Sequence, residues 1–264
     1  MPRRGTRTRR TRTSRRSSSR RRPRIGYTRD TGLVPYTAAV SRFKPELKFK
    51  DSTVADPSML PTNIPSVSTG ARFISSVVAL TQGASGSQRI GRKVNVKSLL
   101  IRGAIELPAK DFSSGTSWLA STNRVRLVVV LDRQCNATAA AWSDVFDTQA
   151  ANNSQVDAQR KMENSKRFRI LCDKILAFTS PAMISNGANL RSMGTKKTIK
   201  KYIKFPKGVP VTYSTTSADP PTVAEVITNN ILVFLIADSN NSTGGNNDDY
   251  TRLESLTCRM RYQD

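Results

Sequence analysis

The side chains with the clearest chemistry in this sequence are the arginines near its start. Residues 1–29 contain thirteen arginines, no lysine and no acidic residue, among mostly Ser, Thr, Gly and Pro. A guanidinium donates a planar fork of hydrogen bonds that fits phosphate oxygens, and such contacts carry no information about base sequence. At this density the arginines predict sequence-tolerant binding of nucleic acid. The predicted phosphate-binding residues are Arg3, Arg4, Arg7, Arg9, Arg10, Arg12, Arg15, Arg16, Arg20, Arg21, Arg22, Arg24 and Arg29.

The same segment, residues 1–29, is predicted to be a disordered basic arm. It has almost no apolar residue before Ile25, so it cannot bury enough surface to offset its chain entropy. Its like charges repel one another and keep it extended until a polyanion binds. A mitochondrial transit peptide has a similar composition but forms an amphipathic helix. Residues 1–24 contain no Leu, Phe or Trp for such a helix, so this alternative is disfavoured.

Residues 30–70 are predicted to be a proline-containing linker, because five prolines interrupt any long element. Aromatic residues alternate with cations from Tyr27 to Phe49, a pattern that suits single strands, since bases stack on rings while cations hold phosphates. Tyr27 and Tyr36 fit this nucleic-acid role and a role in anchoring the linker equally well. Anchoring against the body is favoured for Phe43 and Phe49.

The residue types that are missing exclude much enzyme chemistry. The chain has no histidine, which removes Ser-His-Asp and Cys-His catalysis and most transition-metal sites. Lysine or carboxylate mechanisms remain possible in principle. Cys135, Cys172 and Cys258 lie far apart without a CxxC pair, so they are interpreted as buried apolar residues in a reducing compartment. We therefore expect no enzyme activity, no cofactor and no metal site.

The charge of the remaining chain points to the same class of partner. Of the net charge of +24, the arm supplies thirteen units, so residues 30–264 still carry +11. Such an excess favours nucleic acid over acidic proteins or membranes. The longest apolar run, 231–237, is too short to span a membrane, and the charged start lacks the apolar region of a secretory signal.

Residues 71–264 are predicted to form one all-β domain that follows the arm. Apolar residues recur with period two or form short continuous runs, separated by turn-rich stretches, and only 139–151 looks helical, as a short surface helix. This order favours a single eight-stranded antiparallel sandwich, of which the jelly roll is the commonest plan. The eight predicted strands are 71–81, 93–107, 124–132, 167–179, 195–205, 209–216, 230–238 and 251–263.

Alternation within these strands predicts which side chains face the core. The face of 251–263 that carries Leu256 and Met260 is apolar, and so is the face of 195–205 that carries Ile199 and Ile203. In 167–179 the predicted core face is Phe168, Ile170, Cys172, Leu176 and Phe178.

Two further patterns have competing interpretations. The lysine cluster Lys196, Lys197, Lys200, Lys201 and Lys204 is typical of an edge strand protected from aggregation, which is favoured over direct contact with nucleic acid. The sequence GSQRIGRK (86–93) resembles a phosphate-binding loop but lacks its Lys-Ser/Thr ending, so it is interpreted as a turn before a strand.

Taken together, the chain resembles the capsid proteins of small circular single-stranded DNA viruses that encode a replication initiator, the circovirus-like group. The resemblance is carried by the Arg-rich start and four segments, RIGRKVNVKSLLIRGAIEL (89–107), RVRLVVVLDRQCN (124–136), WSDVFDT (142–148) and KRFRILCDK (166–174). It implies a single jelly roll, with about sixty copies forming a small icosahedral T=1 shell. It also implies an arm that faces the interior, binds the genome and serves as a nuclear localisation signal.

We therefore expect a capsid protein that packages single-stranded DNA and occurs in the virion and, during assembly, in the host nucleus. Expected partners are further copies of the chain, the genome, host nuclear import receptors and a host cell-surface attachment factor that the sequence does not identify. One alternative is a capsid of the same fold around single-stranded RNA, because phosphate contacts do not distinguish the two nucleic acids. Another is a cellular nucleic-acid-binding protein with a basic tail.

Overall fold

The computed structural model describes the part of the chain that follows the predicted arm. The chain divides into two compact units, Met1–Lys44 and Pro45–Asp264, and only the second contains described residues. The arm, Tyr27, Tyr36 and Phe43 therefore lie outside the described part. The described residues are 46–54, 62–65, 71–107, 111–112, 121–148, 155–180, 182–184, 190–192, 194–215, 220–238 and 251–264.

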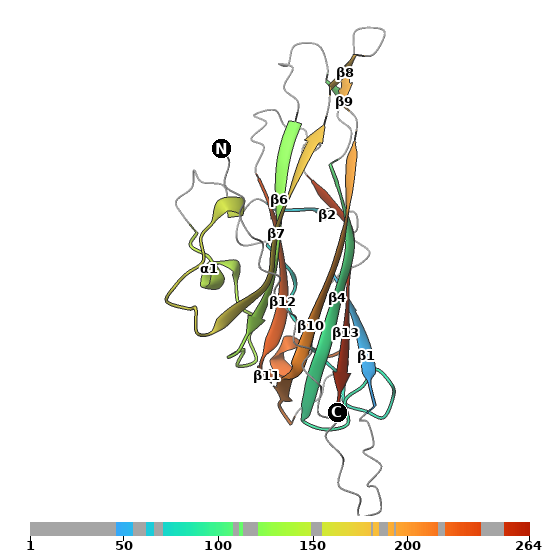
Figure 1. Ribbon diagram of the computed structural model, residues 1–264, viewed down its shortest axis with the longest axis vertical. Coiled ribbons are helices and arrows are strands. Elements are labelled where there is room, and N and C mark those ends of the chain that lie inside the picture. Colours follow the sequence, from blue (N-terminus) through green and yellow to red (C-terminus); the bar gives the residue numbers. More distant parts are fainter. Residues whose placement is uncertain are drawn as a thin grey trace, which may run out of the picture. The chain divides into compact units, whose positions relative to one another are not determined.

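The second unit is nearly all β, as predicted, and its thirteen described strands form three antiparallel sheets (Figure 1). Sheet A has the order β1-β13-β4-β10-β11, with β2 paired to β13, and sheet B has the order β3-β12-β6-β7. A small third sheet has the order β5-β9-β8. The strands of sheet A are β1 (Lys48–Thr53), β2 (Thr62–Asn63), β4 (Lys93–Leu107), β10 (Thr195–Tyr213), β11 (Val226–Thr228) and β13 (Arg252–Gln263). Sheet B contains β3 (Arg72–Ile74), β6 (Ser121–Asp132), β7 (Phe168–Ser180) and β12 (Asn230–Ala237), and the third sheet contains β5 (Asp111–Phe112), β8 (Ala182–Ile184) and β9 (Leu190–Ser192).

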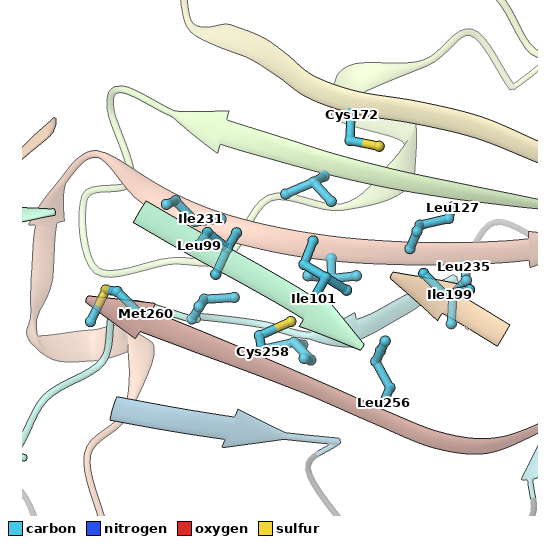
Figure 2. Close-up of a cluster of buried hydrophobic side chains, with 14 of the residues drawn as sticks. Leu99, Ile101, Leu127, Cys172, Ile199, Ile231, Leu235, Leu256, Cys258 and Met260 are labelled. Atoms are coloured by element: carbon cyan, nitrogen blue, oxygen red, sulfur yellow. The ribbon is translucent and has the colours of Figure 1, made fainter. Parts of the chain in front are cut away.

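The main core lies between sheets A and B. Figure 2 shows Leu99 and Ile101 of β4, Cys258 of β13, Leu127 of β6 and Ile231 of β12 in one cluster of apolar side chains. Burial alternates along β13, as expected for a strand with one face in the core and one face in solvent. The predicted core faces of β13 and of the first part of β10 are confirmed, because both sets of side chains pack in this cluster.

Sheet B is buried on both faces along β12 and the middle of β6, which explains the continuous apolar sequences of these two strands. Every residue of β12 is buried, and β6 lies between β12 and β7. In β6, Leu127 and Val129 join the main core, whereas Val128 and Val130 join a second apolar cluster on the other side of the sheet. The prediction that 124–132 is a central strand is confirmed.

The three cysteines are buried free thiols, as predicted. Cys258 and Cys172 lie in the main core, where Figure 2 shows them, and Cys135 belongs to the same cluster. Burial raises the pKa of the Cys258 thiol to about 12 and also raises the pKa of the other two thiols. A thiol with a raised pKa is a poor nucleophile, so these residues serve packing.

All eight predicted strands lie after residue 70, but the structure also has strands before it. Residues 48–53, which the sequence analysis placed in the linker, form β1 and pair with β13 along their full length. Lys48 is 5% exposed, and its Nζ lies 2.8 Å from a carboxylate oxygen of Asp264. The sequence KFKDST contains one apolar residue, so it has no period-two signal. Residues 48–53 form a strand because they pair with β13, which is distant in sequence.

The predicted break between two strands near residue 207 is wrong, because β10 runs from Thr195 to Tyr213. Its register to β4 shifts between Lys204 and Val209, and Gly208 in this interval has φ +78°. A Cβ on Gly208 would lie 1.8 Å from Oδ1 of Asn95, so both the backbone and the space require glycine. A bulge of this kind lets the strand continue through Pro206, Lys207 and Gly208. Prolines are tolerated in a strand at a sheet edge.

The predicted single core face of 167–179 is divided by another bulge. Val129 pairs with Cys172 and Val130 pairs with Ile170, which leaves Leu171 as an extra residue. One extra residue reverses the faces of a strand. Cys172, Leu176 and Phe178 therefore lie in the main core, while Phe168 and Ile170 pack in the cluster on the other side of sheet B.

Among the described residues of the predicted helix at 139–151, which end at 148, the four residues of α1 (Trp142–Val145) are helical, and α1 buries Trp142 and Val145 instead of lying on the surface. Trp142 is 1% exposed and belongs to the second apolar cluster, on the side of sheet B that faces away from the main core. Two 3₁₀ turns, η3 (Gln155–Asp157) and η4 (Val223–Glu225), are the other described helical elements. Within the described part of the chain, no helix is long and apolar enough to cross a membrane.

Candidate nucleic-acid interface

The arm residues predicted to bind nucleic acid lie outside the described residues. This holds for all thirteen arginines between Arg3 and Arg29, and for Tyr27 and Tyr36. Their role stays a prediction. The described domain nevertheless carries a surface with related chemistry, which no segment of the sequence reveals by itself.

This surface, here called the basic face, is the side of sheet A that points away from the main core. Side chains directly opposite each other in an antiparallel sheet point to the same side, with Cβ atoms about 5 Å apart. The strand register therefore places residues from four strands in three adjacent rows. Across β10, β4, β13 and β1, these rows are Lys204–Ser98–Arg261–Phe49, Tyr202–Leu100–Arg259–Asp51 and Lys200–Arg102–Thr257–Thr53.

Four of the cations in these rows are exposed, and no carboxylate of the described residues pairs with them. They are Arg102, Lys200, Lys204 and Arg261. Arg259, in contrast, is engaged: its Nε and Nη2 donate to the two carboxylate oxygens of Asp51, each at 2.7 Å. These hydrogen bonds hold the pKa of Asp51 below its ordinary value.

Apart from Asp51, the acidic residues of the same sheet face lie at its other end. Glu106 lies opposite both Lys196 and Arg252 in the register. Lys196 forms a salt bridge with Glu254, which lowers the pKa of Glu254, whereas hydrogen bonding to Glu254 raises the pKa of Glu106. Charge is therefore balanced at this end, and the unpaired positive charge is concentrated in the three rows.

The prediction that the lysine cluster lies on an edge strand is confirmed. From Thr195 to Lys204, β10 pairs with β4 on one side, and its other side pairs with a described strand only at Thr212 and Tyr213. The five lysines do not form one group, however. The even-numbered members, Lys196, Lys200 and Lys204, are on the basic face, and the odd-numbered Lys197 and Lys201 are on the opposite side.

Lys197, on the side of β10 opposite the basic face, contacts sheet B. Its ammonium group donates to the carbonyl oxygen of Ala177 and lies 5.3 Å from the centroid of the Phe178 ring. It therefore ties the edge of sheet A to β7 of sheet B.

Two aromatic residues are exposed on the basic face. Tyr202 is 55% exposed, between Lys200 and Lys204 along β10. Phe49 is 52% exposed, and the guanidinium carbon of Arg259 lies 5.3 Å from its ring centroid. Phe49 therefore contacts the body through Arg259, in keeping with the anchoring interpretation, while its side chain stays exposed. Aromatic rings among cations suit the stacking of bases and the binding of phosphates.

Over β12 and the middle of β6, the chain covers the outer face of sheet B, so the described residues there offer no comparable surface. Trp142 stacks on Phe146 with ring centroids 4.2 Å apart and meets Phe234 of β12 edge-on at 5.8 Å. Arg126 lies over the rings of Trp142 and Phe146 and is 8% exposed. It donates to both carboxylate oxygens of Asp173, at 2.9 and 2.6 Å, and to the carbonyl oxygens of Val156 and Ala158.

The turn predicted at 86–93 is confirmed, and it contains a buried charge that no sequence pattern indicates. Arg89 is fully buried, with its guanidinium carbon 4.5 Å from the ring centroid of Tyr213. Its Nε donates to the carbonyl oxygen of Leu80 at 3.2 Å, and a carboxylate oxygen of Glu225 lies 3.9 Å away. Burial raises the pKa of Tyr213. This cluster fixes the loop to the body and is closed to ligands.

No known family model matches this chain, and no curated protein matches it. Among the described residues, no group of three or more acidic or thiol side chains is placed to hold a metal ion.

Proposed function

We propose that this chain is a non-enzymatic viral capsid protein that assembles into a small icosahedral shell and packages single-stranded DNA through its arginine-rich arm. The proposed shell is a T=1 particle of about sixty copies. The observation that carries the proposal is the combination of thirteen arginines within residues 1–29 with a two-sheet β domain whose strand order fits a jelly roll.

The strand order supports the jelly roll in detail. A jelly roll contains eight strands in two four-stranded antiparallel sheets. Counted along the chain, we take these to be β1, β3, β4, β6, β7, β10, β12 and β13. The first, eighth, third and sixth then form sheet A, and the second, seventh, fourth and fifth form sheet B. This interleaving supports a jelly roll, with β1 in place of the strand predicted at 71–81 as the first.

The charge of the arm supports packaging of a genome. Sixty arms carry about 780 arginine charges, which neutralise a large share of the phosphates of a genome of order a thousand nucleotides. Arginine forks hold phosphates without reading bases, and a shell must accept its whole genome. We propose that the same arm is recognised by host nuclear import receptors, so that assembly occurs in the nucleus and the mature protein resides in the virion.

Electron microscopy and nuclease treatment of the purified protein test this proposal. We expect uniform hollow particles whose extracted nucleic acid is degraded by DNase and resists RNase. Degradation by RNase alone would instead favour the RNA capsid. A monomer that persists under varied salt and pH would contradict the capsid function and favour a cellular nucleic-acid-binding protein.

Deletion of residues 2–24 tests the role of the arm in the same assay. The folded domain contains none of these residues, so its thermal denaturation should be unchanged. We expect most of the nucleic acid to be lost from the particles. An unchanged nucleic-acid content would show that the arm does not package the genome.

A further inference from the structure

We infer that the basic face of sheet A is a second, ordered binding site for single-stranded nucleic acid, in which Tyr202 stacks on a base and the surrounding cations hold the phosphates. This inference rests on the proposed function and deepens it. The arm supplies charge, whereas the basic face supplies a fixed geometry for the strand.

The first argument is the unbalanced charge of the face. Lys200 and Arg102 lie directly opposite each other in adjacent strands, a position in which like charges destabilise a sheet. The carboxylates on this face of the sheet are already engaged: Asp51 binds Arg259, Glu254 binds Lys196, and Glu106 is hydrogen-bonded to Glu254. Removal of this repulsion requires an anion from outside the described domain.

The second argument is the position of Tyr202. More than half of its surface is in solvent, although its neighbour across the sheet, Leu100, offers apolar contact on one side. Lys200 and Lys204 flank it along β10, and Arg102 lies diagonally across the sheet. A ring held between cations presents a stacking surface with phosphate-binding groups on either side.

The third argument is the repeat along β10. Alternate residues of a strand are about 7 Å apart and point to the same face. Lys200, Tyr202 and Lys204 therefore form a regular cation–ring–cation series at a sheet edge. An extended nucleic-acid strand can follow this series with one base on the ring and a phosphate on each lysine.

The same geometry disfavours other ligands. In duplex DNA the bases are stacked inside, and a groove admits a helix or a two-stranded ribbon, neither of which the outer face of this multi-stranded sheet presents. Contact with the same face of a second copy is disfavoured, because both faces would carry the same exposed cations. An acidic protein would meet the charge but would leave the ring without a specific role.

Photo-crosslinking tests the site directly. The full chain is mixed with a single-stranded oligodeoxynucleotide that contains 5-iododeoxyuridine, irradiated, digested and analysed by mass spectrometry. We expect an adduct at Tyr202 in addition to adducts within residues 1–44. Adducts confined to residues 1–44 would overturn the inference but leave the proposed packaging function intact.

Binding measurements with substituted full-length protein supply the matched controls. At a salt concentration that screens the arm, Tyr202→Leu should weaken single-strand binding by about 5- to 100-fold, because a stacked base is lost. Tyr202→Phe should restore it, since the ring is retained. The inference would be overturned if the unsubstituted protein and both variants bound the oligonucleotide with equal affinity and if polyglutamate competed as well as unlabelled oligonucleotide. That result would show a general polyanion surface.

Two adjacent lysines provide a test of the phosphate contacts. Lys200→Gln removes a cation from the basic face, and Lys201→Gln removes one from the opposite side of the same strand. The slope of log affinity against log salt should become less negative by about 0.7 for Lys200→Gln and stay unchanged for Lys201→Gln. Equal slopes for the two variants would contradict a strand that lies on this face. Failure of the unsubstituted full-length protein to form particles would contradict the proposed function instead.

Discussion

Sheets A and B share one core but differ in their outer faces. Sheet B is covered by residues of the 133–167 connection, and every residue of its strand β12 is buried. Sheet A keeps its outer face open along β10, β4 and β13, and that face carries cations and an exposed tyrosine. The chain covers its own apolar surface and leaves its charged surface open, so the open face is the one suited to an external polyanion.

The composition of the two outer faces explains the difference. Val128, Val130, Phe234 and Ile236 point outward from sheet B, and their exposure would be unfavourable by about 1.5–3 kcal/mol per side chain. The connection between β6 and β7 buries them beneath Trp142 and its neighbours. The outer face of sheet A consists mostly of Lys, Arg, Thr and Ser, which water solvates, so it requires no cover.

The largest expected effect comes from the cover on sheet B. Trp142→Ala should destabilise the protein by about 3–5 kcal/mol, because it removes a fully buried ring that packs on Phe146 and Phe234. Tyr202→Ala on sheet A is the matched aromatic control and should change stability by less than about 0.5 kcal/mol. Urea denaturation measures both. Similar losses would show that the two faces are equally covered.

An arginine on each sheet gives the next comparison. Arg126→Met should cost about 2–4 kcal/mol, because two buried carbonyl oxygens and Asp173 lose their donor. Arg102→Met removes an exposed guanidinium that no described carboxylate pairs with, so its effect should stay within about 0.5 kcal/mol or be slightly stabilising. Thermal denaturation at matched salt checks the pair. A larger cost for Arg102→Met would assign that residue a structural role.

The smallest effect concerns pH and the attachment of β1. The pKa of Asp51 is lowered in the folded protein by hydrogen bonds from Arg259, so its stabilising contribution is present above the ordinary pKa of 3.8. This contribution should be lost as pH falls through the lowered pKa. Hydrogen exchange of the β1 amides should accelerate there, and Asp51→Asn should remove the pH dependence.

Glu106, on the same sheet, should give stability the opposite dependence on pH. Its pKa is raised by hydrogen bonding to Glu254, so its contribution is present at low pH and is lost as pH rises through the raised value. Exchange at the Glu106 end of β4 should therefore slow on acidification. Acceleration at both places would indicate general acid unfolding.

Much of the fold could be predicted because the strands with one open face alternate. In β13 and the first part of β10 the alternation identified the core residues correctly. The bulge at Leu171 and the pairing of β1 could not be predicted, because both depend on partners distant in sequence. Gly208 allows Pro206 to lie within one strand, a tertiary effect that overrides the usual meaning of a Pro-Gly turn.

The basic face could not be predicted for the same reason. Its residues come from positions near 50, 100, 202 and 260, and only the register of four strands brings them together. Within the lysine cluster, spacing shows which members share a side, but not that Arg102 and Arg261 join Lys200 and Lys204. The arm differs in this respect, because its arginine-rich composition alone predicts that it binds phosphates.

Image reconstruction of particles formed by the full chain tests the central claim most directly. The account predicts a closed shell of about sixty copies in which the basic face, with Tyr202, points inward to density for nucleic acid. A shell with this face on its outer surface, or a protein that forms no shell, would contradict the account.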